Sequence, residues 1–126
     1  MENGTGLEYG LSLSLFVKRK VKFNMDLNWF LDALKDEVEG ATTYIKTAIE
    51  LKAMSDKMSK TFYDMAIQES EHAKKIFDMS MEYYEKISGA WSNNIPEFII
   101  DTKEQIVDCY TKKSVEIKLL IGMYKD

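Results

Sequence analysis

The chain has 126 residues, of which 45% are hydrophobic and 30% are charged, and its net charge is −4. This length predicts a single domain with a buried core. The acidic balance and the single arginine among the 17 basic residues argue against a nucleic-acid-binding protein, and no apolar stretch approaches the ~20 residues that a membrane span needs.

The first 24 residues differ in composition from the rest of the chain. Leucine and serine alternate over residues 11–15, and three basic residues follow at 18–20. Alternation with period two predicts a short strand, and the order of apolar before basic residues is the reverse of a secretory signal peptide. We therefore expect residues 1–24 to form a loosely attached N-terminal arm or an upstream extension, and residues 25–126 to form the folded domain.

Turn and capping signals divide the remaining sequence into three predicted helices, at about residues 26–53, 59–87 and 94–124. Gly89 is expected to end the second helix, and Asn94 is expected to cap the third. The first two helices are long and joined by a short turn, so they must form an antiparallel hairpin against which the third helix packs. The predicted fold class is all-α.

The spacing of apolar residues predicts which face of each hairpin helix is buried. Steps of four and three residues indicate a line of side chains, or seam, that faces a partner helix. The predicted seam of the first helix is Leu27, Leu31, Leu34, Val38, Ala41, Ile45 and Ala48. The predicted seam of the second helix is Met58, Phe62, Met65, Glu69, His72, Ile76, Met79 and Tyr83.

Two ionisable residues occupy consecutive positions of the second predicted seam. They are Glu69 and His72, the only histidine of the chain, and burying either one unpaired would cost several kcal/mol. The Glu-x-x-His spacing lets both side chains reach one metal ion. The sequence therefore predicts a metal site here. The competing interpretation is a buried ion pair between glutamate and histidine.

The first helix carries a matching carboxylate. Glu37 lies on a line with Phe30 and Tyr44 that is otherwise apolar, and it is at a similar distance from the turn as His72. Gly40 costs about 1 kcal/mol in a helix interior relative to alanine, which predicts that another backbone approaches closely there. We expect Glu37 to be the third ligand of the site.

The third helix adds no histidine. Cys109, in this helix, is the only cysteine of the chain, so an intrachain disulfide is excluded. We expect it to be a small core residue. A chain without disulfides suits a cytoplasmic protein in a reducing compartment. A di-iron centre in a four-helix bundle needs one glutamate from each of two helices and one Glu-x-x-His from each of the other two. One chain supplies half of this set, so we expect a homodimer or a higher homo-oligomer that completes it.

The stretch from Glu37 to Tyr44, followed by Glu69-x-x-His72, resembles the first half of a rubrerythrin or ferritin-like domain. The resemblance covers about half the chain and implies a ferritin-like hairpin, with Glu37, Glu69 and His72 as iron ligands and Tyr44 beside them. A half-site completed by dimerisation is similar to the encapsulated ferritins. No cargo peptide is recognisable after Tyr124, so an encapsulin shell is not supported as a partner.

These observations predict a metal-binding ferritin-like protein that oxidises Fe(II) with O₂ or peroxide at a dimer interface. The residues with a catalytic role would be the three predicted ligands. Iron is the expected metal, with zinc and manganese as alternatives because carboxylate and imidazole ligands suit them as well. The alternative function is a non-catalytic helical oligomerisation or scaffold protein with a vestigial or zinc-filled site.

Overall fold

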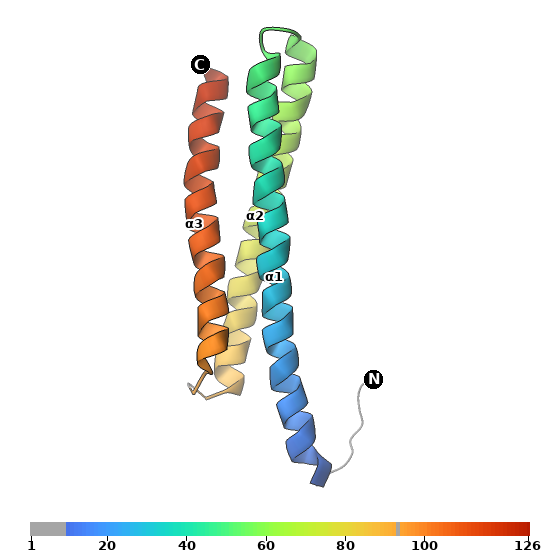
Figure 1. Ribbon diagram of the computed structural model, residues 1–126, viewed down its shortest axis with the longest axis vertical. Helices are drawn as coiled ribbons and strands as arrows, with labels where there is room; N and C mark the ends of the chain where they lie inside the picture. The colour runs from blue at the N-terminus through green and yellow to red at the C-terminus, as the bar shows by residue number, and fades with distance from the viewer. Residues whose placement is uncertain (1–9, 93) are drawn as a thin grey trace.

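The computed structural model describes the backbone of residues 10–92 and 94–126, and the side chains from Leu27 onward within these ranges. It contains the helices α1 (Gly10–Leu51), α2 (Asp56–Ala90) and α3 (Glu97–Lys125), and no strand lies among the described residues. The helices α1 and α2 form an antiparallel hairpin, and α3 runs beside them, with its C-terminal end close to the α1–α2 turn (Figure 1). The predicted all-α hairpin with a third helix is confirmed.

The N-terminal part of α1 corrects the sequence prediction. Residues 11–15 are helical, so the expected strand is wrong, and α1 begins long before residue 26 and extends past the ends of the other helices (Figure 1). No glycine or proline interrupts residues 11–26, and leucine and lysine favour helix, so each added residue extends a helix that is already nucleated. Residues 1–9 lie outside the described chain, and the division into arm and domain stays a prediction.

The helix ends follow local chemistry. The Ser55 side chain accepts a hydrogen bond from the Met58 backbone N–H at 3.2 Å and so caps α2. Gly89 lies within the last turn of α2, and the residue with left-handed backbone is Ser92, with φ of 51°. The predicted Asn94 cap is also wrong, because α3 begins only after Pro96. Proline disfavours helical backbone at the residue before it, which prevents an earlier start.

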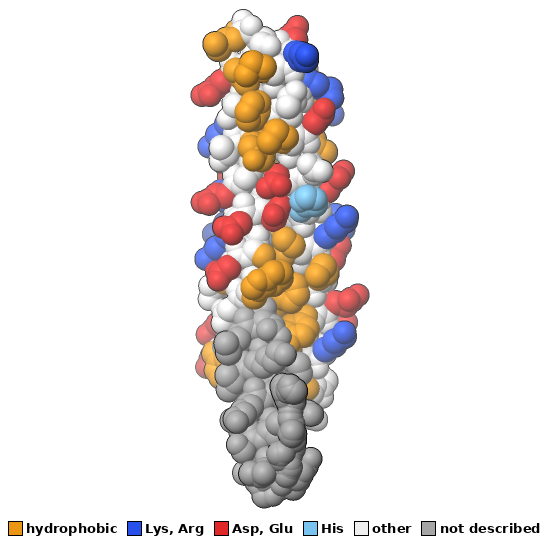
Figure 2. Space-filling model, turned by 90° about the vertical axis from the view of Figure 1, so that its right-hand side faces the viewer, with side chains coloured by type: hydrophobic (Ala, Val, Ile, Leu, Met, Phe, Trp, Pro, Cys, Tyr) orange, Lys and Arg blue, Asp and Glu red, His pale blue; other side chains and the backbone are white. Residues whose placement is uncertain are grey.

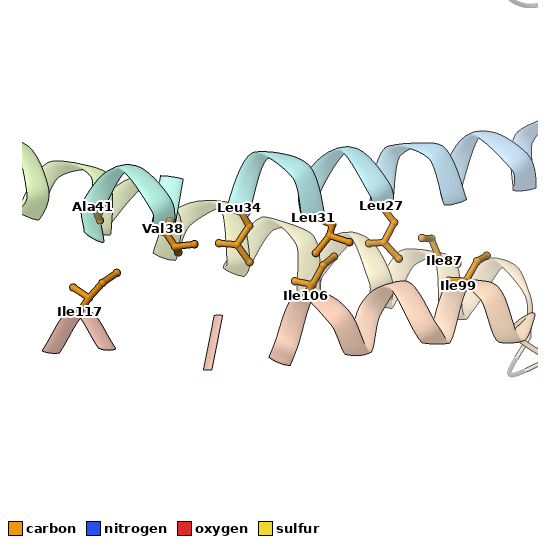
Figure 3. Close-up of a cluster of buried hydrophobic side chains, with 10 residues drawn as sticks. Leu27, Leu31, Leu34, Val38, Ala41, Ile87, Ile99, Ile106 and Ile117 are labelled. Atoms are coloured by element: carbon orange, nitrogen blue, oxygen red, sulfur yellow. The ribbon is translucent and has the colours of Figure 1, made fainter. Parts of the chain in front are cut away.

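The predicted seam of α1 is confirmed, since all seven of its residues are buried. In Figure 3 the labelled side chains of α1 point toward α3, and Ile99, Ile106 and Ile117 of α3 meet them. Ile87 of α2 closes one end of this cluster. The core thus lies between α1 and α3, with α2 along one side.

The predicted seam of α2 is wrong by one line of side chains. The buried residues recur every seven positions and are mostly small: Ser59, Ala66, Ala73, Ser80 and Ile87. Small side chains let α1 and α2 approach closely, as the 2.6 Å hydrogen bond from Ser59 Oγ to the Ala48 carbonyl indicates. The large residues of the predicted seam therefore flank this contact. Two of them, Met58 and Met79, are about half exposed.

The helix α3 packs more extensively on α1 than on α2. Its contacts with α2 include three that involve aromatic rings: Phe77 stacks on Tyr110, Tyr63 stacks on Tyr124, and Lys103 lies over the ring of Tyr84. Cys109 packs partly buried against the core, as expected. Within the described residues, no helix is both long enough and apolar enough to cross a membrane.

Candidate metal centre

The structure brings together the three residues that the sequence predicts as ligands. Glu37 lies in the C-terminal half of α1, and Glu69 and His72 lie one turn apart on α2, so all three side chains can meet beside the α1–α2 contact. One potential ligand atom from each lies within 4.8 Å of the other two. Among the described side chains, no second group of three such residues is found. The role of the three residues as metal ligands stays a prediction.

The distances within the cluster are longer than good hydrogen bonds. His72 Nδ1 lies 3.4 Å from Glu37 Oε1 and 3.8 Å from Glu69 Oε2. Glu37 Oε1 is buried and has no hydrogen-bond partner. A carboxylate oxygen in this position loses its water without gaining a donor, which is costly unless a cation compensates it. The two carboxylates and the imidazole form a donor set that fits a first-row transition metal ion.

The electrostatics of Glu69 point in the same direction. Burial raises the pKa of the Glu69 carboxyl, the negative charge of Glu37 and a side-chain hydrogen bond with Glu37 raise this pKa further, and His72 offsets part of the increase. Two carboxylates held together disfavour each other's ionised form. A bound cation would remove this repulsion.

Gly40 has a different neighbour from the one predicted. A Cβ at this position would lie 2.6 Å from Glu69 Oε1, and the next two nearest atoms are also in the Glu69 side chain. We expected a second backbone to lie closest to Gly40, but the closest group is a side chain. The glycine accommodates a carboxylate of the candidate site.

The site opens to the surface, which corrects the prediction that His72 is buried. The His72 side chain is 47% exposed, whereas those of Glu37 and Glu69 are each 26% exposed. The histidine lies beyond the contact with α1 because the buried line of α2 passes through its neighbour, Ala73. We use the term site face for the surface of the α1–α2 hairpin that carries these three residues.

Hydrophobic side chains lie on both sides of the charged cluster. Figure 2 shows the histidine and acidic side chains in the middle of the site face, with hydrophobic groups above and below them. Tyr44 contacts Phe62 with ring centroids 6.0 Å apart, and Phe30 contacts Tyr83 at 5.8 Å. The structure thus places Tyr44 next to an apolar residue of the site face, and its predicted role beside the metal stays a prediction.

Comparison with known proteins identifies a family that the chain matches. The family model described as Rubrerythrin matches residues 28–124, a range that contains all of α2 and the three clustered residues. No curated protein and no solved structure matches the chain.

Proposed function

The chain belongs to the rubrerythrin family of ferritin-like proteins, and from this premise we propose that two copies of it form a di-iron oxidoreductase that oxidises Fe(II) with O₂ or peroxide. The observation that carries the proposal is the convergence of Glu37, Glu69 and His72, with a buried carboxylate oxygen that lacks a hydrogen-bond partner. The iron binding that is typical of this family supports the choice of metal.

Each ligand residue would have a distinct role. Glu37 and Glu69 supply the negative charge that compensates metal ions, and His72 supplies a neutral nitrogen. In the proposed reaction two Fe(II) ions each lose one electron. Either O₂ takes up both electrons and two protons to give hydrogen peroxide, or hydrogen peroxide takes up both electrons and two protons to give two water molecules. Because the carboxylates are largely shielded and His72 is half exposed, the open side of the site is the histidine side.

A second copy of the chain is the proposed source of the remaining ligands. Two copies related by a twofold axis through the site face would bring together four glutamates and two histidines, the full set for a di-iron centre. The hydrophobic side chains beside the cluster (Figure 2) would be buried in the same contact. Met58 and Met79 lie on either side of the ligands along α2. Each is about half exposed in the single chain, and the dimer contact would remove this exposed apolar surface from water.

Iron oxidation tests the enzymatic part of the proposal. Apo protein without a histidine tag is mixed with Fe(II) in air, and near-ultraviolet absorbance is followed. We expect a fast rise that saturates at about one iron per chain, as two half-sites per dimer require. Glu37→Ala should abolish the rise, and Glu39→Ala, in an exposed position of the same helix, should keep it.

Metal content tests the ligand set separately from catalysis. Purified protein should carry about one transition metal per chain and lose it on Glu69→Ala or His72→Ala, while Glu39→Ala retains it. Since metal is expected to bind the dimer better than the monomer, removal of the metal by a chelator should lower the molar mass measured by light scattering.

Two outcomes would count against the proposal. Zinc retained in the wild type without iron oxidation would favour the scaffold function instead. Equal metal content in all variants would contradict the site itself.

A further inference from the structure

We infer that Gly40 is a positioning residue of the metal centre, because its missing side chain leaves the space in which the Glu69 carboxylate lies. This inference rests on the proposed function, in which Glu69 is a metal ligand. It assigns a role to a residue that has no donor atom of its own.

The three nearest neighbours of a Cβ built at Gly40 support this role. They are Glu69 Oε1 at 2.6 Å, Cδ at 3.6 Å and Cγ at 3.8 Å. The first distance is shorter than atoms tolerate, so a methyl group and the present carboxylate position exclude each other. The other two glycines with described side-chain surroundings, Gly89 and Gly122, have nothing within 4 Å of such a Cβ. The contact with a carboxylate is therefore specific to Gly40 among these three.

The position of Gly40 along α1 explains how it acts on the site. It lies three residues after Glu37, so the two residues share a face of the helix. Glu69 Oε1 lies against the α1 backbone at Gly40, while its Oε2 lies 3.8 Å from His72 Nδ1. The glycine thus lets the Glu69 carboxylate reach α1, where Glu37 is.

A methyl group at position 40 would act on the site more than on the fold. The clashing atom is the end of a flexible side chain, which can move outward at little cost to helix packing. Alanine also favours helix over glycine, so the substitution by itself supports α1. The carboxylate, however, would be displaced from α1, and metal binding is sensitive to displaced ligands.

Affinity measurements on Gly40→Ala test the inference. Anaerobic Fe(II) binding is measured by competition with a chromophoric chelator, and melting temperature is measured on the chelator-treated protein. We expect the affinity to fall by about 10- to 100-fold, while the melting temperature of the apo protein stays the same or rises. The matched control is Gly122→Ala. It also adds a methyl group to a helix, but nothing lies within 4 Å of the added group, so the affinity should stay unchanged.

A shorter carboxylate provides the rescue. Aspartate at position 69 withdraws the carboxylate from the added methyl group, so Glu69→Asp should weaken metal binding less in the Gly40→Ala protein than in the wild type. Fully additive losses would overturn the inference, because they would mean that the two positions do not interact. The same conclusion follows if Gly40→Ala binds Fe(II) as tightly as the wild type, or if it only lowers the apo melting temperature.

These outcomes separate the inference from the proposed function. If the wild-type protein binds no metal, both the proposed function and the inference are overturned. If the wild type binds Fe(II) and Gly40→Ala binds it equally well, the proposed function stands and the inference alone is overturned.

Discussion

Two faces of α1 differ in how completely the chain covers them. The seam that begins at Leu27 is fully buried against α2 and α3 and contains no titratable residue. The line of Phe30, Glu37 and Tyr44 is only half buried, and its central residue is a carboxylate with an oxygen that lacks a hydrogen-bond partner. The seam thus forms the apolar core of the single chain, whereas the site face keeps a costly polar group, as functional sites do.

The largest expected effect is on the seam. Leu34→Ala should lower the free energy of unfolding by about 2–5 kcal/mol, because it removes a fully buried side chain and leaves a cavity. This change is measured by denaturant unfolding of chelator-treated protein, with wild type and variants at the same protein concentration. Val115→Ala, at an exposed position of α3, should cost less than about 0.5 kcal/mol. Equal effects of the two substitutions would contradict the burial of Leu34 in the core.

The next prediction concerns the close contact between α1 and α2. Ala73→Leu should destabilise the protein by about 1–3 kcal/mol, because the added side chain has no room on the buried line of α2. Lys75→Leu, at an exposed position of the same helix, is the control. The measurement is again the free energy of unfolding. A neutral Ala73→Leu would mean that the large residues of α2, and not the small ones, face α1.

A charge on the site face should weaken the proposed dimer without unfolding the chain. Met79→Glu should raise the dimer dissociation constant at least about tenfold, equivalent to about 1.4 kcal/mol, because it places a charge in the apolar part of the contact. Sedimentation of metal-loaded protein measures the constant. Leu119→Glu, which alters an exposed apolar residue of α3, should have little effect. The reverse result would assign the dimer contact to α3.

The smallest expected effect is a pH dependence of the apo protein. The raised pKa of Glu69 means that the folded chain retains a proton that the unfolded chain has already released. Stability should therefore fall as pH rises from the ordinary carboxyl pKa through the raised value, and the loss is complete above both. The difference between wild type and Glu69→Gln, measured by denaturant unfolding in chelator from about pH 4 to about pH 8, isolates this group. A difference that does not change with pH would contradict the shift.

Much of the fold and the site could be predicted because the signals are local. The seam of α1 is built of large apolar residues at helical spacing, and only one face of that helix satisfies the pattern. The short turn before α2 forces a hairpin, so Glu37 had to lie near Glu69 and His72. The cap of α2 is also local, since Ser55 accepts its hydrogen bond from the Met58 backbone three residues on, but α2 begins at Asp56 and not at the predicted residue 59.

The tertiary structure decided what depended on a neighbouring helix. Which line of α2 is buried could not be predicted from its large residues, because the close contact with α1 selects small ones such as Ala66 and Ala73. His72 is consequently half exposed, and Gly40 faces a carboxylate instead of a backbone. The sequence alone determined which residues could meet, since helical spacing and chain connectivity fix their positions along each helix. How deeply they lie was decided by packing between helices, which depends on side-chain volumes from distant parts of the chain.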